Sequence, residues 1–275
     1  AIGSASSVEA ASESKLHGII SLMGEPVSGA SVTLWEARSG QDPRQIKTFS
    51  SSKNGEFKFS IMKKQGIVHY LVAEGGKIHG SPSKQLAMLT VLGGQESNTV
   101  VINELTTVGS VWPNAQLLQN TSLTGSSSAL SIGSSQVQNL VNQSTGRHGR
   151  TLLNGSNLLN SETAVRMNVL SNLIALCGNP SQRDGCDQLL SLTNSENTLS
   201  AMISIARQPW KNVSSLYSLF KQYYPIDKIT QFRSTATLPY LLFEPKSFSL
   251  SLVFDGGGAL ALGKLMFDGK GNLWS

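Results

Sequence analysis

Residues 160–225 read NSETAVRMNVLSNLIALCGNPSQRDGCDQLLSLTNSENTLSAMISIARQPWKNVSSLYSLFKQYYP, and helical periodicity, helix stops and both cysteines coincide in this stretch. Apolar residues recur at helical spacing after a capping position at Asn160 or Ser161, and Gly178 follows where a left-handed residue can end the helix. Three further apolar faces follow, and prolines end the last two helices. The stretch therefore predicts a helical module with four apolar faces, made by Val165, Val169, Leu170, Leu173, Ile174 and Cys177, by Cys186, Leu189 and Leu190, by Leu199, Met202, Ile203 and Ala206, and by Val213, Leu216, Tyr217, Phe220 and Tyr224.

The two cysteines of this module are Cys177 and Cys186, and the chain has no others. In an oxidising compartment they would close a small ring worth roughly 2–3 kcal/mol in the chain-entropy model. Their spacing matches neither a CxxC motif nor a zinc-binding pattern, although two free thiols in a cytosolic protein remain the alternative. We expect a disulfide between Cys177 and Cys186, and no metal site.

Before this module the pattern is that of strands. Residues 1–14 are small and polar and predict a flexible leader. Seven short apolar or alternating runs follow, separated by turn residues, at residues 16–21, 30–35, 46–50, 56–60, 68–73, 88–91 and 99–105. Asn54-Gly55 between two of these runs predicts a type I′ hairpin turn. The runs predict an antiparallel β-sandwich of the transthyretin or immunoglobulin type over residues 15–106.

The helical middle domain is expected over residues 107–225 and a β segment over residues 226–275. Ser, Asn, Gly, Thr and Gln dominate residues 107–159, where we expect loops, a helix starting near Trp112-Pro113 and another at residues 135–141. After Pro225, strand patterns return at residues 238–243, 248–254, 263–267 and 272–274. The predicted fold class is therefore α+β, with a sandwich, a small disulfide-pinned helical domain and a C-terminal β-hairpin segment.

Two parts of the chain resemble known families. The series Gly24-Glu25-Pro26-Val27-Ser28-Gly29-Ala30, followed by Lys53-Asn54-Gly55-Glu56-Phe57, resembles the carboxypeptidase-regulatory-like, transthyretin-like sandwich of exported bacterial proteins. Phe267-Asp268-Gly269-Lys270-Gly271-Asn272-Leu273-Trp274 resembles the strand–turn–strand signature of NHL-type and streptogramin-lyase-like propellers. A propeller needs several blades, and this sequence ends within the first.

The order of these parts is similar to that of a group of exported bacterial proteins of uncharacterised function. They join a regulatory-like sandwich, a helical region and an NHL-type propeller. The resemblance covers nearly the whole chain and is carried by residues 104–112, 172–177, 205–210 and 263–268. It implies that any lyase-like catalytic residues would lie in later blades, so no catalytic residue is carried onto this sequence.

Composition points to the same cellular location. Only 14% of the 275 residues are charged, the net charge is +5, and no apolar run reaches the roughly 20 residues needed to span a bilayer. Lysines and arginines are scattered without aromatic interleaving, which argues against nucleic-acid binding. We expect a secreted, periplasmic or cell-surface protein.

No catalytic constellation stands out from the sequence. Ser-x-x-Lys occurs three times in places that do not activate a lysine, and no Gly-x-Ser-x-Gly elbow is present. The aromatic residues are more typical of core packing than of a glycan-binding surface. Whether the protein binds a small molecule or a glycan is therefore left undecided by the sequence. We expect a non-enzymatic protein without catalytic residues, cofactor or metal.

Apolar strands near the C-terminus favour association with other proteins or with further copies of the chain, since exposed edges pair. The alternative is the front portion of a larger propeller protein whose ligand-binding or lyase activity lies in missing blades. The residues expected to form the assembly edge are Leu250, Leu252, Phe254, Leu265, Phe267 and Trp274.

Overall fold

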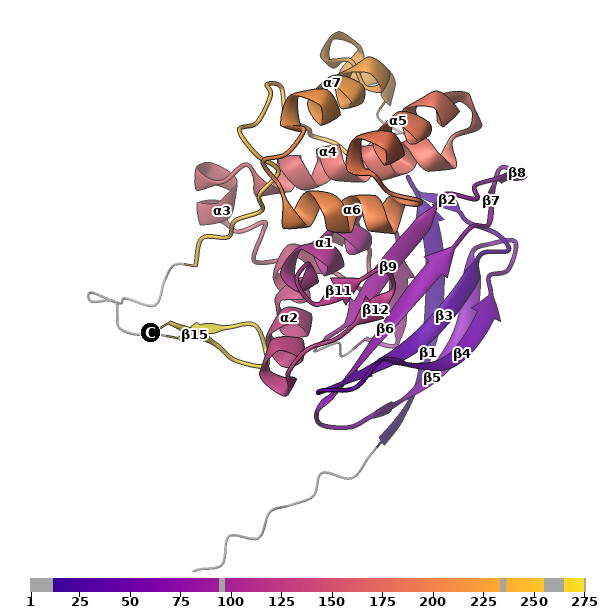
Figure 1. The fold of residues 1–275 in the computed structure, drawn as a ribbon, viewed down its shortest axis with the longest axis vertical. Helices are drawn as coiled ribbons and strands as arrows, with labels where there is room; N and C mark the ends of the chain where they lie inside the picture. The colour runs from indigo at the N-terminus through magenta and orange to yellow at the C-terminus, as the bar shows by residue number, and fades with distance from the viewer. Residues whose placement is uncertain (1–11, 94–96, 233–235, 255–264, 275) are drawn as a thin grey trace, which may run out of the picture.

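The computed structural model describes residues 12–93, 97–232, 236–254 and 265–274. It is a mixed α+β structure in which two four-stranded sheets lie beside a body of helices (Figure 1). In sheet I, β1 (Ser12–Leu22) pairs with β2 (Glu25–Pro26), β5 (Glu56–Lys63) and β10 (Thr99–Ile102). Sheet II has the order β4 (Arg44–Ser50), β3 (Ser31–Arg38), β6 (Ile67–Glu74) and β9 (Ala87–Leu92).

The seven predicted strands correspond to β1, β3, β4, β5, β6, β9 and β10. Strand β1 begins at Ser12, inside the predicted leader, whose residues 1–11 lie outside the described residues. The expectation of purely antiparallel pairing is wrong for β10, which runs parallel to β1 with Val101 opposite Ile19. The chain crosses to sheet II and returns between these two strands, and such a crossover permits a parallel pair.

The predicted hairpin at Asn54-Gly55 is also wrong. Strand β4 pairs with β3, and β5 pairs with β1, so this turn carries the chain from sheet II to sheet I. Gly55 has φ +74°, whereas Asn54 is not among the residues with positive φ that a type I′ turn requires at both positions. A β carbon at residue 55 would lie 2.3 Å from the carbonyl oxygen of Ile20. Glycine is therefore needed here for a close crossing as well as for its φ.

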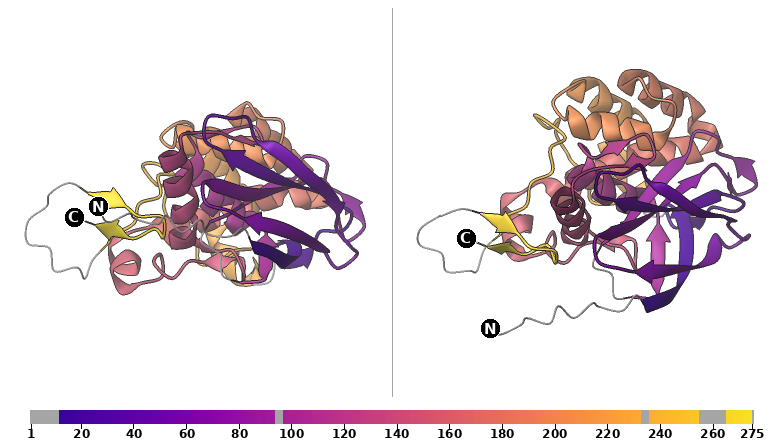
Figure 2. Two further views of the ribbon diagram at one scale, coloured as in Figure 1. Left: turned by 90° about the horizontal axis from the view of Figure 1, so that it is seen from below. Right: turned by 60° about the horizontal axis from the view of Figure 1, so that its bottom comes forward.

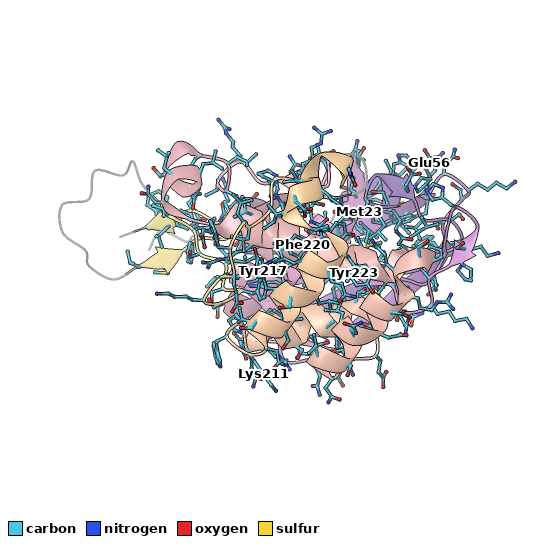
Figure 3. All side chains as sticks on the ribbon, turned by 90° about the horizontal axis from the view of Figure 1, so that it is seen from above. Met23, Glu56, Lys211, Tyr217, Phe220 and Tyr223 are labelled. Atoms are coloured by element: carbon cyan, nitrogen blue, oxygen red, sulfur yellow. A yellow bond between two sulfur atoms is a disulfide. The ribbon has the colours of Figure 1, made fainter. Side chains whose placement is uncertain are left out.

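The helical part contains all four predicted helices of residues 160–225. They are α4 (Thr163–Ala175), α5 (Arg183–Thr193), α6 (Thr198–Arg207) and α7 (Val213–Tyr223). Short 3-10 turns, η1 (Leu176–Gly178) and η2 (Pro180–Gln182), link α4 to α5, and η3 (Ile226–Phe232) follows α7. Figure 3 shows Tyr217 and Phe220 on α7, where Phe220 is fully buried and its ring meets Tyr240 edge to face.

Three helices lie before this module: α1 (Glu104–Asn114), α2 (Ser127–Leu140) and α3 (Gly155–Asn160). The predicted strand 99–105 ends early because Asn103 caps α1 through a reciprocal pair of hydrogen bonds with Thr106, both 2.8 Å. Trp112-Pro113, expected to start a helix, lies in the last turn of α1. The helix predicted at residues 135–141 is the second half of α2.

The disulfide between Cys177 and Cys186 is confirmed and joins η1 to α5. Gly178 does not have the predicted left-handed conformation. Its role is close packing, because a β carbon there would lie 2.0 Å from Cδ2 of Leu22 and 2.7 Å from Cδ1 of Ile78. The glycine lets η1 touch the end of β1.

Sheet II is tied to the helices along β9. The amides of Ala87, Leu89 and Val91 donate to the hydroxyls of Thr198, Thr107 and Ser110, at 2.9, 3.1 and 3.0 Å. Helices α1 and α6 thus satisfy the edge that β9 would otherwise leave unpaired. A single cluster of buried side chains runs from both sheets into the helices, and the expected boundary between residues 106 and 107 falls within α1.

The C-terminal part differs most from expectation. Residues 238–243 and 248–254, predicted as strands, have no strand structure. Of the other predicted strands, residues 263 and 264 lie outside the described residues, and β15 (Met266–Phe267) and β16 (Leu273–Trp274) form a short hairpin. This hairpin lies at the side of the molecule remote from the sheets (Figure 2). Three further two-residue ladders are β7 (Lys77–Ile78) with β8 (Ser81–Pro82), β11 (Leu118–Gln119) with β12 (Ser122–Leu123), and β13 (Val141–Asn142) with β14 (Arg147–His148).

Candidate functional site

The predicted assembly residues lie on two pieces of the C-terminal region. Leu250, Leu252 and Phe254 belong to residues 237–254, which we call the C-terminal strap. Leu265 directly precedes β15, and Phe267 and Trp274 lie in the hairpin β15–β16. The structure brings the two pieces together at one point, where the rings of Phe254 and Phe267 meet with centroids 5.6 Å apart.

The first half of the strap is held by amide side chains of α4. Asn172 donates to the carbonyl of Thr237 at 3.1 Å and accepts from its amide at 2.8 Å. Asn168 donates to the carbonyl of Pro239. A primary amide offers a donor and an acceptor, as a peptide group does, so Asn172 pairs with this segment as a neighbouring strand would.

The second half of the strap is held in the same way, at every second residue. Arg166 donates to the carbonyl of Ser249 at 3.0 Å. The Thr163 hydroxyl donates to the carbonyl of Ser251 at 2.6 Å and accepts from its amide at 3.0 Å. Asn157 of α3 pairs with both main-chain groups of Val253 at 2.8 and 2.7 Å.

This pairing explains why the predicted strand at residues 248–254 is absent. The segment has the alternation of a strand, but its partners are side chains of α3 and α4 rather than another strand. Leu250 and Leu252 turn their side chains partly onto the core. Their main-chain groups make no hydrogen bond among the described residues, so the outer edge of the strap is open.

The hairpin is organised by one carboxylate. Asp268 accepts from the amides of Lys270 and Asn272, from the side-chain amide of Asn272 and from the indole of Trp274, at 2.8 to 3.0 Å. The bonds from the Asn272 side chain and from Trp274 hold the pKa of Asp268 well below its usual range. Gly271 adopts φ +81°, which closes the turn.

The hairpin turn docks on α2. The hydroxyl of Ser135 donates to the carbonyl of Asp268 at 3.3 Å, and Asn139 donates to the carbonyl of Gly271 at 3.0 Å. A β carbon at residue 271 would lie 2.8 Å from the carbonyl oxygen of Ser135, so the turn approaches the helix closely. These contacts leave the apolar side chains of the hairpin free to face solvent.

Exposed apolar side chains lie on α3 and at the hairpin, which are on the same side of the molecule (Figures 1 and 2). We define the C-terminal apolar face by the large side chains that α3 and the hairpin expose to solvent. They are Leu158 (54% exposed), Leu159 (85%), Leu265 (55%), Met266 (69%) and Trp274 (64%). Exposed apolar groups that lie close together are typical of interaction surfaces.

Sequence reasoning missed Leu158, Leu159 and Met266. The Leu158-Leu159 pair lies in a helix of six residues, too short to show a helical period. Met266 lies next to Phe267, which was predicted. The sequence feature that could have pointed to this surface is the leucine pair itself, because the surrounding segment is otherwise rich in Ser and Asn.

Among the described residues, Glu104 is the acidic residue most perturbed by burial. It is 5% exposed, and burial raises the pKa of its carboxyl to about 7, while amides of Glu104 and Met23 partly oppose the rise. Its carboxylate accepts from the Met23 amide at 3.3 Å. A neighbouring hollow of about 290 Å³ is lined by Met23 and Tyr224 but not by Glu104. We interpret Glu104 as a structural link between sheet I and α1.

Among the described residues, no three side chains of His, Cys, Asp or Glu come together as metal ligands would. No helix in the same residues is both long and apolar enough to cross a bilayer. No protein-family model matches the chain, and no curated protein is significantly similar to it in sequence.

Proposed function

We propose that this is a non-enzymatic extracellular or cell-envelope protein that binds other proteins, or further copies of itself, through its C-terminal β edges. The observation that carries the proposal is the C-terminal apolar face beside the open outer edge of the strap. Main-chain groups at Leu250 and Leu252 are available there to an added strand.

The size of the hairpin supports the same proposal. Each of its strands has two residues, and the contacts with α2 hold its turn, so the hairpin makes few main-chain hydrogen bonds of its own along its strands. Met266 and Trp274 stand opposite each other and are both mostly exposed. A strand added at this hairpin would cover apolar side chains and complete main-chain hydrogen bonds together.

The disulfide is consistent with an oxidising location such as the periplasm or the cell exterior. The presence of two four-stranded sheets in the first part of the chain supports the proposal of a carboxypeptidase-regulatory-like sandwich, as in exported bacterial proteins. In such proteins this sandwich would act as a spacer or adhesion unit, which agrees with a role exerted through surfaces.

A second candidate is the front portion of an NHL-type or streptogramin-lyase-like propeller protein, with ligand-binding or lyase activity in further blades. The turn organised by Asp268 favours it, because one carboxylate fixes both the tight turn and the Trp274 indole. In that case the following blades, rather than a second copy, would cover the C-terminal apolar face.

The test is the mass of the protein in solution as its concentration rises, measured by light scattering after size exclusion. We expect the wild type to associate and Met266→Glu to remain monomeric, because the charge would be buried in the contact. Trp210→Glu is the matched control, since Trp210 is equally exposed at 69% but lies before α7. A wild-type mass that stays at 29.3 kDa at all concentrations contradicts self-association.

The second candidate is tested on protein isolated from its natural source. An intact mass well above 29.3 kDa, together with further Asp-x-x-Gly-Asn-Leu-Trp repeats in the protein, would favour the propeller. A mass near that value would leave assembly through the β edges as the better account.

A further inference from the structure

A cavity of about 530 Å³ lies between the two sheets, away from the C-terminal apolar face. Its apolar walls come from both sheets: Leu16 and Phe59 of sheet I, and Leu34 and Phe49 of sheet II. Its size is in the range of small-molecule sites. The residues that line it include Lys15, Lys47 and Lys58 but no aspartate or glutamate.

Lys47 has an unusual position in this cavity. It lies directly opposite Leu34 and two residues before Phe49 on β4, so its side chain is on the face of sheet II that is turned toward sheet I. Leu34 is 1% exposed, and Phe49 packs against Phe57 and Phe59 of sheet I. The Lys47 ammonium lies 5.4 Å from the centre of the Phe49 ring. Lys47 itself is exposed on this edge strand, so its ammonium stands at the open side of the cavity, above the apolar residues of the same face.

None of these lysines forms an ion pair among the described residues. Of the acidic groups on the adjoining strands, Glu56 lies 3.9 Å from His17, and Glu13 stands two residues before Lys15 on β1. By contrast, the two arginines at the other end of β3 and β4, Arg38 and Arg44, are both paired with Glu36. The charge left without a partner at the cavity is therefore positive.

We propose that this cavity binds an anionic amphiphile, with a long-chain carboxylate as the simplest ligand. Its hydrocarbon chain lies among Leu16, Leu34, Phe49 and Phe59, and its carboxylate pairs with the Lys47 ammonium. Burying the chain supplies the affinity, and the exposed cation at the open side of the cavity selects the charged head group. The net charge of +5 also favours an anionic ligand.

The test is calorimetric titration with dodecanoate below its micelle concentration, and with dodecan-1-ol as the uncharged probe. We expect saturable binding of dodecanoate to the wild type. Lys47→Gln weakens it roughly tenfold or more, because a charged hydrogen bond is lost, and leaves dodecan-1-ol binding unchanged. Lys53→Gln is the matched control, since Lys53 is exposed in the turn after β4 and does not line the cavity.

Amide chemical-shift changes locate the ligand. Changes centred on β1, β4 and β5 support the proposal, whereas changes centred on Met266 and Trp274 overturn it, because the ligand then binds the C-terminal apolar face. Absence of saturable binding to the wild type also overturns it. A Lys47→Gln protein that binds dodecanoate as tightly as the wild type also overturns it. If that variant also self-associates, the role of Lys47 is to prevent strand pairing at the edge of β4.

Discussion

Glu104 couples the stability of the fold to pH. Its folded-state pKa of about 7 is raised from 4.5 by burial, so between these values the folded protein holds a proton that the unfolded chain has released. The stability contributed by this group therefore falls as pH rises from about 4.5 to about 7, and is constant above that window.

We predict that Glu104→Gln removes this fall, because glutamine has the same shape and stays neutral. Below pH 4.5 the variant and the wild type should have similar free energies of unfolding. At pH 8 the variant should be more stable by on the order of 3 kcal/mol, measured by urea denaturation. Glu74→Gln, at an exposed position of β6, is the control. An unchanged pH profile for Glu104→Gln would show that the carboxyl is not desolvated as described.

Residues also show where sequence reasoning stops. The sequence shows a glycine after a helix, and a left-handed cap is the usual reason for one there. Gly178 is instead required by Leu22, which is 156 positions earlier in the chain and touches it in the fold. A contact of this kind leaves no local pattern, so no inspection of residues 160–180 alone can find it.

At the scale of elements, α4 explains the largest difference between pattern and fold. Its buried residues include Thr163, Asn168, Ser171 and Asn172 as well as its apolar face, so the helix is buried on several sides. Periodicity correctly predicted the helix and its apolar face. It did not predict that the polar side chains of the helix would form hydrogen bonds with the main chain of the strap, as a neighbouring strand would.

We predict that Asn157→Ala loosens the end of the strap without unfolding the protein. Asn157 makes two hydrogen bonds to Val253, and their loss leaves that main-chain segment without its partner on α3. The amide of Val253 should exchange with deuterium at least about tenfold faster, as measured by NMR. Asn160→Ala is the control, since the side-chain hydrogen bond of Asn160 among the described residues is to Ser156 of its own helix. Equal exchange in both variants would mean that Asn157 does not hold the strap.

At the scale of the whole molecule, the core joins the sheets to the helices. Thr107, Ser110 and Thr198 fix β9 to α1 and α6, and the buried cluster is continuous between them. The order of strands and helices follows from local periodicity, whereas this continuity depends on long-range contacts that no local pattern contains. We therefore expect the sheets and the helices to unfold together.

Replacing Cys177 and Cys186 by alanine tests this expectation. The disulfide closes a ring with a sequence separation of 9, so its loss should cost roughly 2–3 kcal/mol of stability. In guanidinium titrations of a protein in which Trp112, Trp210 and Trp274 are replaced by phenylalanine, fluorescence of Trp35 on β3 and the helical circular dichroism signal should shift by the same amount. A variant in which only the helical signal shifts would show that the two parts unfold separately.

The hydroxyls along β9 also set the number of sheet contacts that one molecule can make. With that edge occupied by α1 and α6, the open edge of sheet II is β4. Pairing between copies along β4 would use the same surface on both molecules, about a two-fold axis, and would leave no further edge of sheet II exposed. Sheet II is in this sense monovalent: it can form a closed pair but cannot propagate a fibre.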